Sequence, residues 1–495
     1  MMAENGETRF VAECRLRDMK LQPELCYQAI KTRDTRFDGL FFVGVTTTRI
    51  YCRPVCPART PGEARCRYFA NAAAAEAAGF RPCLRCRPEL APGHAPIDAA
   101  GRVARAAAAR IEAGALNGRD LESLAAEFDL SERQLRRVME QELGVTPIQL
   151  AQTQRLLLAK RLLSETRLPM TQVAHASGFA SLRRFNALFR SRYRLSPGAL
   201  RRNAGAPGEG DALRLKLAYR PPLAWSAFVR FLAGRGASTV EWAEGNRYWR
   251  TVKLGDKRGW ISVEPAREGH WLWLQLSTSL VPQLPALLWR LRHMFDLSAQ
   301  PALIDAHLAQ DARLRPLIAR TPGLRVPGAF DGFELAVRAI LGQRISVRIA
   351  SLLAGRVAEA FGEVIQTPHP ELRRLSPGAE ILAEVSAARL RAIGLGGPPV
   401  EAIRALARAV ADGRLLLSPG PHAEGALEQL KELPGIGEWT AQYIGLRALR
   451  MPDAFPHSDL GLCKALNATP NQVLKLAEAW RPWRAYAALH LWNSL

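Results

Sequence analysis

Hydrophobic and polar residues alternate in two parts of the chain and recur at helical spacing in most of the remainder. Residues 41–47 alternate, which predicts a strand, and a short Ala-rich helix is expected at residues 71–78. Between residues 211 and 300 the alternation returns around one predicted helix at residues 223–235. The strand-like segments there are residues 213–217, 247–254, 259–264 and 271–276. This part is therefore expected to be an α+β subdomain with an antiparallel sheet.

Helical spacing dominates two other parts. Between residues 119 and 203 a pattern of two helices and a turn occurs twice, with a long helix at residues 150–163 between the copies. Ser131 and Ser181 stand where each second helix should begin. From residue 305 to the end, amphipathic helices follow one another with short Gly/Pro joints. The chain is therefore predicted to be multidomain and mainly α.

Charge points to a polyanionic partner. The chain holds 68 Lys and Arg against 46 Asp and Glu, a net charge of +22, with a pI near 10.4. The excess is spread over residues 9–90, 119–203 and 211–495 rather than gathered in one tail, so nucleic acid is the expected partner. No run approaches the roughly 18 apolar residues of a membrane span, and no apolar signal core opens the chain. We expect a cytoplasmic, nucleoid-associated protein with no membrane partner.

Four of the eight cysteines fall into two tight pairs. Cys52 and Cys56 form a CxxxC pair, and Cys83 and Cys86 form a CxxC pair. Two loops carrying paired thiolates can close a tetrahedral shell around one Zn²⁺. Cys66 is unpaired within an Arg-flanked loop and is left out of the predicted set. No disulfide framework is expected.

Spacing alone favours a purely structural zinc site, but two features favour a reactive one. Four thiolates leave the cluster at net −2, so at least one sulfur stays nucleophilic. Phosphate-binding side chains surround the cysteines, namely Thr48, Arg59, Arg81 and Arg85. The stretch closely resembles the N-terminal module of the Ada alkylation-repair regulators. This resemblance implies that Cys52, the first cysteine of the quartet, accepts a methyl group from a DNA methylphosphotriester in a stoichiometric transfer.

The Ada family normally continues into a second methyltransferase domain with a Pro-Cys-His-Arg motif. After Cys86 this chain has only Cys463, with no His or Arg following, so no O6-methylguanine transfer is expected. Residues 119–203 instead resemble the AraC-type DNA-binding domain, against the alternative of a plain helical bundle. The resemblance implies that the second helix of each unit enters the major groove of promoter DNA. The expected DNA-facing residues are Gln134, Arg136, Arg137, Arg183, Arg184 and Asn186.

Residues 433–437 read Leu-Pro-Gly-Ile-Gly, a tight hairpin before a helix at residues 438–450. Gly435 and Gly437 let the backbone approach a partner closely, and the amides of the next helical turn suit a DNA phosphate. Asp459 follows nine residues after that helix. An ordinary helical hairpin with a surface Asp is the alternative. With this Asp and the Trp-Thr-Ala that follows the hairpin, residues 211–495 resemble the helix–hairpin–helix DNA glycosylases, in particular the 3-methyladenine glycosylase II branch.

That resemblance implies a monofunctional N-glycosylase that flips an alkylated purine out of double-stranded DNA. Asp459 would be the catalytic carboxylate, with Asp453 as the alternative. Trp439, Tyr443 and Trp492 would line the base pocket, although Tyr443 also suits an ordinary aromatic core. Arg344, where the family commonly has an apolar or amide wedge, and Gln343 would fill the gap left by the flipped base. Trp439 stands where strand-cutting relatives carry a Lys, and the nearby Lys431 precedes the hairpin, so an abasic site is the expected product.

The predicted domains follow from these patterns. They are residues 1–92, an Ada-type zinc-binding α+β module; 93–118, a linker helix; 119–203, an all-α double helix-turn-helix domain; 204–210, a linker; 211–304, the glycosylase α+β subdomain; and 305–495, an all-α helix–hairpin–helix domain. All 11 tryptophans lie after residue 224, which supports the boundary near residues 205–210. A monomer is expected, with RNA polymerase as a further candidate partner. The alternatives are a methylation-responsive regulator whose glycosylase-like half binds DNA without excising bases, and a damage-delivery scaffold without regulation.

Overall fold

The computed structural model describes residues 23–33, 37–38, 41–69, 72–88, 99–202, 212–343 and 345–495. Contacts divide the chain into two compact units, each described by itself below. The first holds residues 1–105 and 130–145, and the second holds residues 106–129 and 146–495. Among the described residues, no helix is both long and apolar enough to cross a bilayer.

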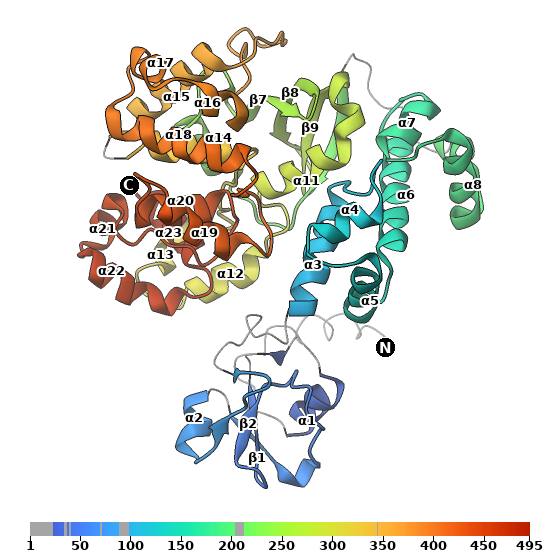
Figure 1. Ribbon diagram of the computed structural model, residues 1–495, viewed down its shortest axis with the longest axis vertical. Coiled ribbons are helices and arrows are strands. Elements are labelled where there is room, and N and C mark those ends of the chain that lie inside the picture. The colour runs from blue at the N-terminus through green and yellow to red at the C-terminus, as the bar shows by residue number, and fades with distance from the viewer. Residues whose placement is uncertain are drawn as a thin grey trace, which may run out of the picture. The chain divides into compact units, whose positions relative to one another are not determined.

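A small four-stranded sheet forms the centre of the first unit (Figure 1). Its order is β3-β1-β2-β4, with β1 antiparallel to β2 and β3 and with β2 parallel to β4. The strands are β1 Phe42–Val45, β2 Ile50–Cys52, β3 Cys66–Phe69 and β4 Arg81–Pro82. The helical elements are α1 Pro23–Thr32, η2 Glu63–Arg65 and α2 Ala72–Ala77. The strand and the helix predicted at residues 41–47 and 71–78 are confirmed, each slightly shorter.

The helix-turn-helix elements are confirmed between α3 and α9. Their bounds are α3 Ala99–Glu112, α4 Leu121–Ala126, α5 Glu132–Leu143, α6 Pro147–Glu165, α7 Met170–Ala176, α8 Leu182–Tyr193 and α9 Pro197–Arg202. Ser131 caps α5 and Ser181 caps α8 through their side chains, as expected. At the turn after α7, Gly178 has φ +86°, and a Cβ there would lie 2.2 Å from Asn117 Oδ1. This position therefore requires glycine.

The antiparallel sheet predicted in the second unit is confirmed with one additional strand. Its order is β5-β9-β8-β7-β6, and every pairing is antiparallel. The strands are β5 Ala212–Ala218, β6 Glu241–Glu244, β7 Arg247–Leu254, β8 Lys257–Pro265 and β9 Trp271–Ser277. The helices are α10 Trp225–Ala233, η5 Thr278–Gln283 and α11 Leu284–Met294. Strand β6 was not predicted, because its four residues, Glu-Trp-Ala-Glu, form a short and acidic segment that does not resemble a strand.

Residues 301–495 are helical, with many of their helices packed around two cores (Figure 1). The helices are α12 Pro301–Leu308, α13 Arg315–Arg320, α14 Gly332–Leu341, α15 Val347–Phe361, α16 Ala379–Glu384, α17 Ala387–Ala392, α18 Gly397–Ala411, α19 Ala423–Glu432, α20 Glu438–Arg447, α21 Leu460–Leu466, α22 Pro470–Ala477, η6 Glu478–Trp480 and α23 Arg484–Trp492. Helix α20 belongs to both cores, because Ala441 and Ile444 pack in one and Leu446 packs in the other. The remaining face of α20 is thereby left to line a groove between them.

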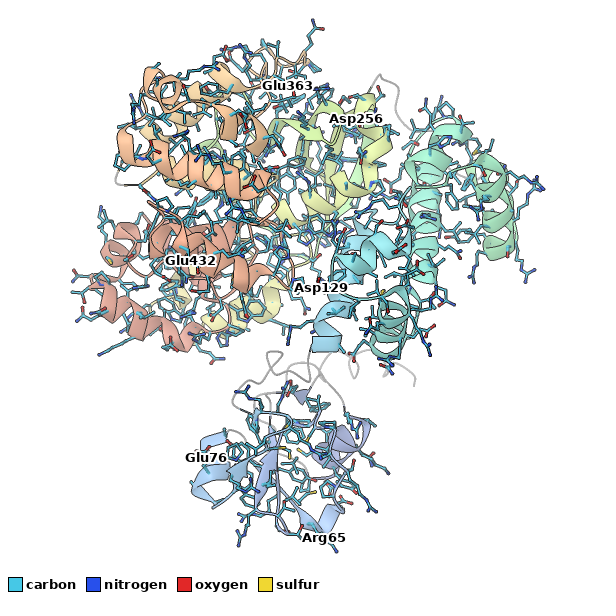
Figure 2. The ribbon with its side chains drawn as sticks, viewed as in Figure 1. Arg65, Glu76, Asp129, Asp256, Glu363 and Glu432 are labelled. Atoms are coloured by element: carbon cyan, nitrogen blue, oxygen red, sulfur yellow. The ribbon has the colours of Figure 1, made fainter. Side chains whose placement is uncertain are left out.

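Ionic contacts tie the sheet to the helices. Glu363, labelled in Figure 2, accepts a hydrogen bond from Lys253 Nζ at 2.6 Å and another from Arg258. These two donors lower the pKa of Glu363 to about 2. A buried group of four charges makes a second tie: Arg250 and Arg338 each contact both Glu241 and Glu334. The quartet joins β6 and β7 to α14, which borders the groove.

Candidate metal centre and candidate active site

Four thiols meet where two loops of the first unit lie side by side. Because β2 and β4 run parallel, with Tyr51 opposite Pro82, the loops that follow them leave the sheet together. Cys52, Cys56, Cys83 and Cys86 place their sulfur atoms within 4.8 Å of one another. Tetrahedral Zn–S bonds of about 2.3 Å require sulfur separations of about 3.8 Å. The observed separations, 4.0 Å between Cys56 and Cys83, fit that shell.

Arg53 holds this cluster from inside. Its side chain is fully buried and pairs with Asp38, and its Nη1 donates to the Cys86 carbonyl at 3.2 Å. Its backbone N–H donates to Cys86 Sγ at 3.4 Å. The close thiols share hydrogen bonds, which raises the pKa of Cys52 and lowers that of Cys56 to about 2. Cys66, whose Sγ lies 3.5 Å from the Gly62 carbonyl, is not part of the four-thiol group, as predicted.

The predicted phosphate-binding residues of this unit all reach the surface. Thr48, Arg59, Arg81 and Arg85 are exposed, whereas Cys52 is 8% exposed. Thr48 lies in the turn between β1 and β2, and Arg81 and Arg85 lie on β4 and in its following loop. Cys52 is therefore recessed, whereas the three arginines lie at the surface of this part of the chain.

Most of the predicted DNA-facing residues of the helix-turn-helix elements are exposed. Arg136 and Arg137 on α5, and Arg183 and Arg184 on α8, are exposed, while Asn186 is half-buried. Arg136 also pairs with Glu132 at 3.9 Å. Gln134 is exposed, and its side-chain oxygen accepts hydrogen bonds from the backbone N–H and the hydroxyl of Ser131, both at 2.9 Å. The capping box of α5 therefore occupies the Gln134 oxygen.

In the second unit, Asp459 is held by three donors. It caps α21, where Leu462 N–H donates to Oδ1 at 3.1 Å. Trp492 Nε1 donates to the same oxygen at 2.8 Å, and Trp439 Nε1 donates to Oδ2 at 2.9 Å. The carboxylate is half-buried and lines the groove. Two indoles from different helices thus fix the orientation of one carboxylate.

The same indoles belong to an aromatic wall. Trp439 and Tyr443, one turn apart on α20, stack with ring centroids 5.4 Å apart and planes 9° apart. Trp492 meets Tyr443 edge-on at 6.1 Å. All three side chains line a groove of about 1690 Å³ and are half-buried. Tyr443 is therefore part of the groove wall as well as packing against the core.

Positive charge surrounds the Tyr443 hydroxyl, which accepts a hydrogen bond from Arg447 Nη1 at 2.9 Å. Burial opposes ionisation of this phenol, but the charges of Arg447, Arg235 and Arg338 outweigh burial and lower its pKa. Burial also lowers the pKa of the Arg447 guanidinium. These three arginines line the groove, and none of them was predicted from the sequence. Arg338 stands four residues after Glu334, and this spacing is typical of an ion pair on the exposed face of a helix. The spacing therefore gave no sign that Arg338 lines a groove.

The hairpin has the expected backbone. Gly435 has φ +80°, and Gly437 is the N-cap of α20 without a side-chain cap. Both glycines are exposed at the groove. Gln343 ties the hairpin down, because its Nε2 donates to the Gly435 carbonyl at 2.9 Å and to Thr440 Oγ1 at 2.8 Å. The wedge role of Gln343 stays a prediction, and Arg344 lies outside the described residues.

Ion pairs engage the two residues that the sequence left as alternatives. Asp453 is bound by both Arg481 and Arg484, with Arg484 Nε at 2.8 Å. Lys431 pairs with Glu428 and Glu438, each at 3.1 Å. Partial desolvation acts in the other direction, but these carboxylates raise the pKa of Lys431. A protonated, paired amine is a poor nucleophile for Schiff-base formation.

Three parts of the chain match known protein families. Residues 25–89 match the metal binding domain of Ada, residues 124–203 match a helix-turn-helix domain, and residues 214–331 match the AlkA N-terminal domain. The DNA-3-methyladenine glycosylase 2 of Escherichia coli (strain K12) is 37% identical over 277 residues, 56% of this chain and 95% of that protein. The bifunctional transcriptional activator/DNA repair enzyme Ada of the same strain is 49% identical over 65 residues, 13% and 18% of the two chains.

One relative aligns with nearly the whole chain. The probable bifunctional transcriptional activator/DNA repair enzyme AlkA of Mycobacterium tuberculosis (strain ATCC 25618 / H37Rv) is 37% identical over 482 residues, 95% of this chain and 96% of the relative. Together with the matched Ada domain, the clustered thiols confirm one Zn²⁺ site. The chain belongs to the family of bifunctional transcriptional activators and DNA repair enzymes called AlkA.

Proposed function

We propose that Asp459 drives the release of alkylated purines such as 3-methyladenine from double-stranded DNA. The observation that carries this proposal is the Asp459 carboxylate, oriented by two indoles beside the stacked rings of Trp439 and Tyr443. A flipped purine enters the groove and stacks on this wall. Alkylation at N3 or N7 gives the purine a positive charge, which an electron-rich ring face attracts by about 1–2 kcal/mol when desolvated.

The reaction breaks the bond between the sugar C1′ and the purine nitrogen. The departing purine keeps the bonding electrons, and positive charge develops on the sugar. The fixed negative charge of Asp459 stabilises that sugar cation, orients a water and takes its proton as the water oxygen bonds to C1′. The amides at Gly437 hold the neighbouring phosphate. No lysine forms a Schiff base, so the product is an abasic site.

Replacing Asp459 with Asn tests this role. The Asn keeps the size of the side chain but loses its charge, so single-turnover release of 3-methyladenine should fall at least 100-fold while duplex binding persists. Asp453→Asn, at the ion-paired carboxylate, is the matched control and should retain release. Equal, measurable rates for the parent and Asp459→Asn would refute the assignment. A folded parent that binds the duplex but releases no base would favour the alternative in which the glycosylase-like half only binds DNA.

We propose that Cys52 accepts the methyl group of a DNA methylphosphotriester. Its sulfur attacks the methyl carbon, the carbon–oxygen bond breaks, and the phosphodiester leaves with the electron pair and a negative charge. When bound, Zn²⁺ keeps the four thiols deprotonated at neutral pH. The thioether has no route back to thiolate, so transfer is stoichiometric. Peptide mapping after exposure to such a duplex should place one added methyl on Cys52, and a methyl on another cysteine would refute the assignment.

We propose that methylation also switches DNA affinity. Loss of one thiolate charge takes the cluster from −2 to −1, which reduces repulsion from DNA phosphates and strengthens binding at low salt. The exposed arginines of α5 and α8 then contact promoter DNA, with Arg136 and Arg183 among them. A monomer that contacts RNA polymerase and stays with the nucleoid is the form we propose for the cell, and the net charge of +22 supports the nucleoid association.

A further inference from the structure

The five-stranded sheet of the second unit buries one face and opens the other. The three leucines of β5 are buried in an apolar core, whereas Arg214 and Lys216 between them are exposed. The three leucines of β9 are buried as well, and Trp271, Trp273 and Gln275 lie half-buried on the open face. A solvated sheet face normally carries polar side chains. The tryptophans on this face therefore need an explanation that the two proposed reactions do not supply.

Cation–π contacts connect β5 to β9 on the open face. Lys216 lies opposite Trp273 in the register of the two strands, and the guanidinium carbon of Arg214 lies 4.1 Å from the centroid of the Trp273 ring. Lys216 Nζ lies 4.6 Å from the centroid of Trp271 and 5.5 Å from that of Trp273. Trp271 meets Trp273 edge-on, with ring centroids 6.2 Å apart and planes at 89°. These contacts hold two rings and two cations together as one group.

The two tryptophans of this group differ in how far they are covered. The backbone at Gly269 lies against Trp271, because a Cβ there would be 1.8 Å from the Trp271 ring, and Lys216 lies over the same ring. Trp271 therefore supports its neighbour and is not open to a ligand. Arg214 stacks on Trp273, and its side chain is 55% exposed. A planar guanidinium stacks on bases as well as on indoles, so this pair keeps a surface on which a base can lie.

A second ring lies on the same face, on β7. Through β8, Trp249 aligns with Gln275, which is two residues along β9 from Trp273. The two rings are thus two strand spacings apart, roughly 10 Å, which leaves room for two separate bases. The guanidinium carbon of Arg247 lies 5.5 Å from the Trp249 centroid, and His369 packs on Trp249 at 5.7 Å. The ring series of the open face therefore runs from Trp273 to Trp249 and ends against His369.

The positive charges on β5 have few partners. Lys216 Nζ makes no ion pair with any residue that the structure describes. Arg214 lies 3.6 Å from the carboxylate of Glu264, and that carboxylate is already bound by Arg247 at 2.6 Å. A carboxylate shared in this way neutralises Arg214 only in part. Both cations of β5 are therefore able to pair with a phosphate.

We propose that this open sheet face binds single-stranded DNA. Bases stack on Trp273 and Trp249, and phosphates pair with Arg214 and Lys216. Aromatic rings beside cations on an open surface are the groups by which proteins bind unpaired strands without reading their sequence. A duplex offers few base faces, because each base is covered by its neighbours in the stack. DNA rather than RNA is the occupant, because the chain belongs to a family of DNA repair enzymes.

The test measures binding of a fluorescein-labelled oligothymidine of about 12 nucleotides to the full chain by fluorescence anisotropy. An unlabelled, undamaged duplex is present at saturating concentration to occupy the groove and the helix-turn-helix elements, and oligothymidine has no purine to enter the groove. Trp273→Leu removes one stacking ring, so the Kd for the strand should rise roughly fivefold or more, the smaller end of what one stacked base contributes. Trp483→Leu, at a half-buried tryptophan outside the sheet, should leave the Kd at the parent value.

Charge and position give two further readouts. Arg214→Ala removes one phosphate contact, so the slope of log Kd against log salt should become shallower by about 0.7. Arg230→Ala, at an exposed arginine of α10, which packs on the buried face of the sheet, should leave that slope unchanged. Irradiation of a strand that carries 5-iododeoxyuridine should crosslink it to the peptide that contains Trp273.

Four results would overturn the proposal. Complete displacement of the strand by the duplex would place it on the surfaces that bind double-stranded DNA. An unchanged Kd in Trp273→Leu would exclude stacking on this ring. Equal loss of strand binding and duplex binding in that variant would indicate a structural role for the ring. An oligouridine of the same length that binds more tightly than oligothymidine would assign the face to RNA.

Discussion

The zinc cluster and the groove each hold one group that we propose to react, but the two sites are assembled differently. The four thiols lie within 35 residues of one another, on two loops set side by side by a short strand pairing. In the groove, Asp459 depends on Trp439, which is 20 residues away, and Trp492, which is 33 residues away and on another helix. The cluster needs one bound ion and local backbone, whereas the groove needs two packed cores. Changes to the cluster should therefore stay local, and changes to packing should reach the groove.

The largest expected effect separates the two chemistries completely. Cys52→Ser removes the nucleophilic sulfur, so methyl transfer from a methylphosphotriester duplex should disappear while release of 3-methyladenine stays at the parent rate. Mass spectrometry of the protein and chromatography of the released bases give both readouts on one sample. Loss of base release in Cys52→Ser would show that the two sites are coupled. It would contradict the expectation that changes to the zinc cluster stay local.

The buried quartet is expected to have the next largest effect. Glu241→Gln removes one of the two carboxylate charges that pair with Arg250 and Arg338. This loss should lower the free energy of unfolding by roughly 3–5 kcal/mol. Although burial opposes ionisation of Glu241, the two arginines lower its pKa to about 2. Its contribution to stability is therefore full above the ordinary value near 4.5 and is lost as pH falls towards 2. Urea unfolding of the variant and of the exposed control Glu244→Gln, at both ends of this window, measures the difference.

His490 should make the helical half sensitive to mild acid. Burial lowers its pKa to about 4, and neither ring nitrogen has a partner among the described residues. The unfolded chain binds a proton near pH 6.5 and the folded chain does not, so stability should fall as pH drops from 6.5 to 4. The loss is at most about 3 kcal/mol. His490→Leu should flatten this part of the stability profile, and an unchanged profile would exclude His490 as its source.

Much of the architecture could be predicted because its signals are local. Cysteine spacing, the Ser131 and Ser181 caps and the alternating strands each depend on a few adjacent residues. The donor roles of Trp439 and Trp492 could not be predicted, because a tryptophan on a helix looks the same whether its N–H meets Asp459 or the core. The hydrogen bonds of Gln134 and Gln343 could not be predicted for the same reason, because nothing in the sequence shows that these side chains bind backbone atoms of the chain itself.

The smallest expected effect concerns the indole N–H of Trp492, which orients Asp459 in the groove. Trp492→Phe keeps an aromatic ring but removes the N–H that donates to Asp459 Oδ1, so base release should fall roughly tenfold. Trp483→Phe, at a half-buried tryptophan that packs on Tyr486, is the matched control and should change release little. A loss of the same size in both variants would attribute the effect to packing.

The most direct measurement counts events per protein molecule on one methylated duplex that carries both 3-methyladenine and a methylphosphotriester. Released purine should exceed the protein many-fold, because Asp459 is regenerated after each cycle, whereas methyl groups on Cys52 should stop at one per molecule. Asp459→Asn should abolish the first count and leave the second intact. A folded protein that releases no purine, or one whose release stops at one per molecule, would contradict the account.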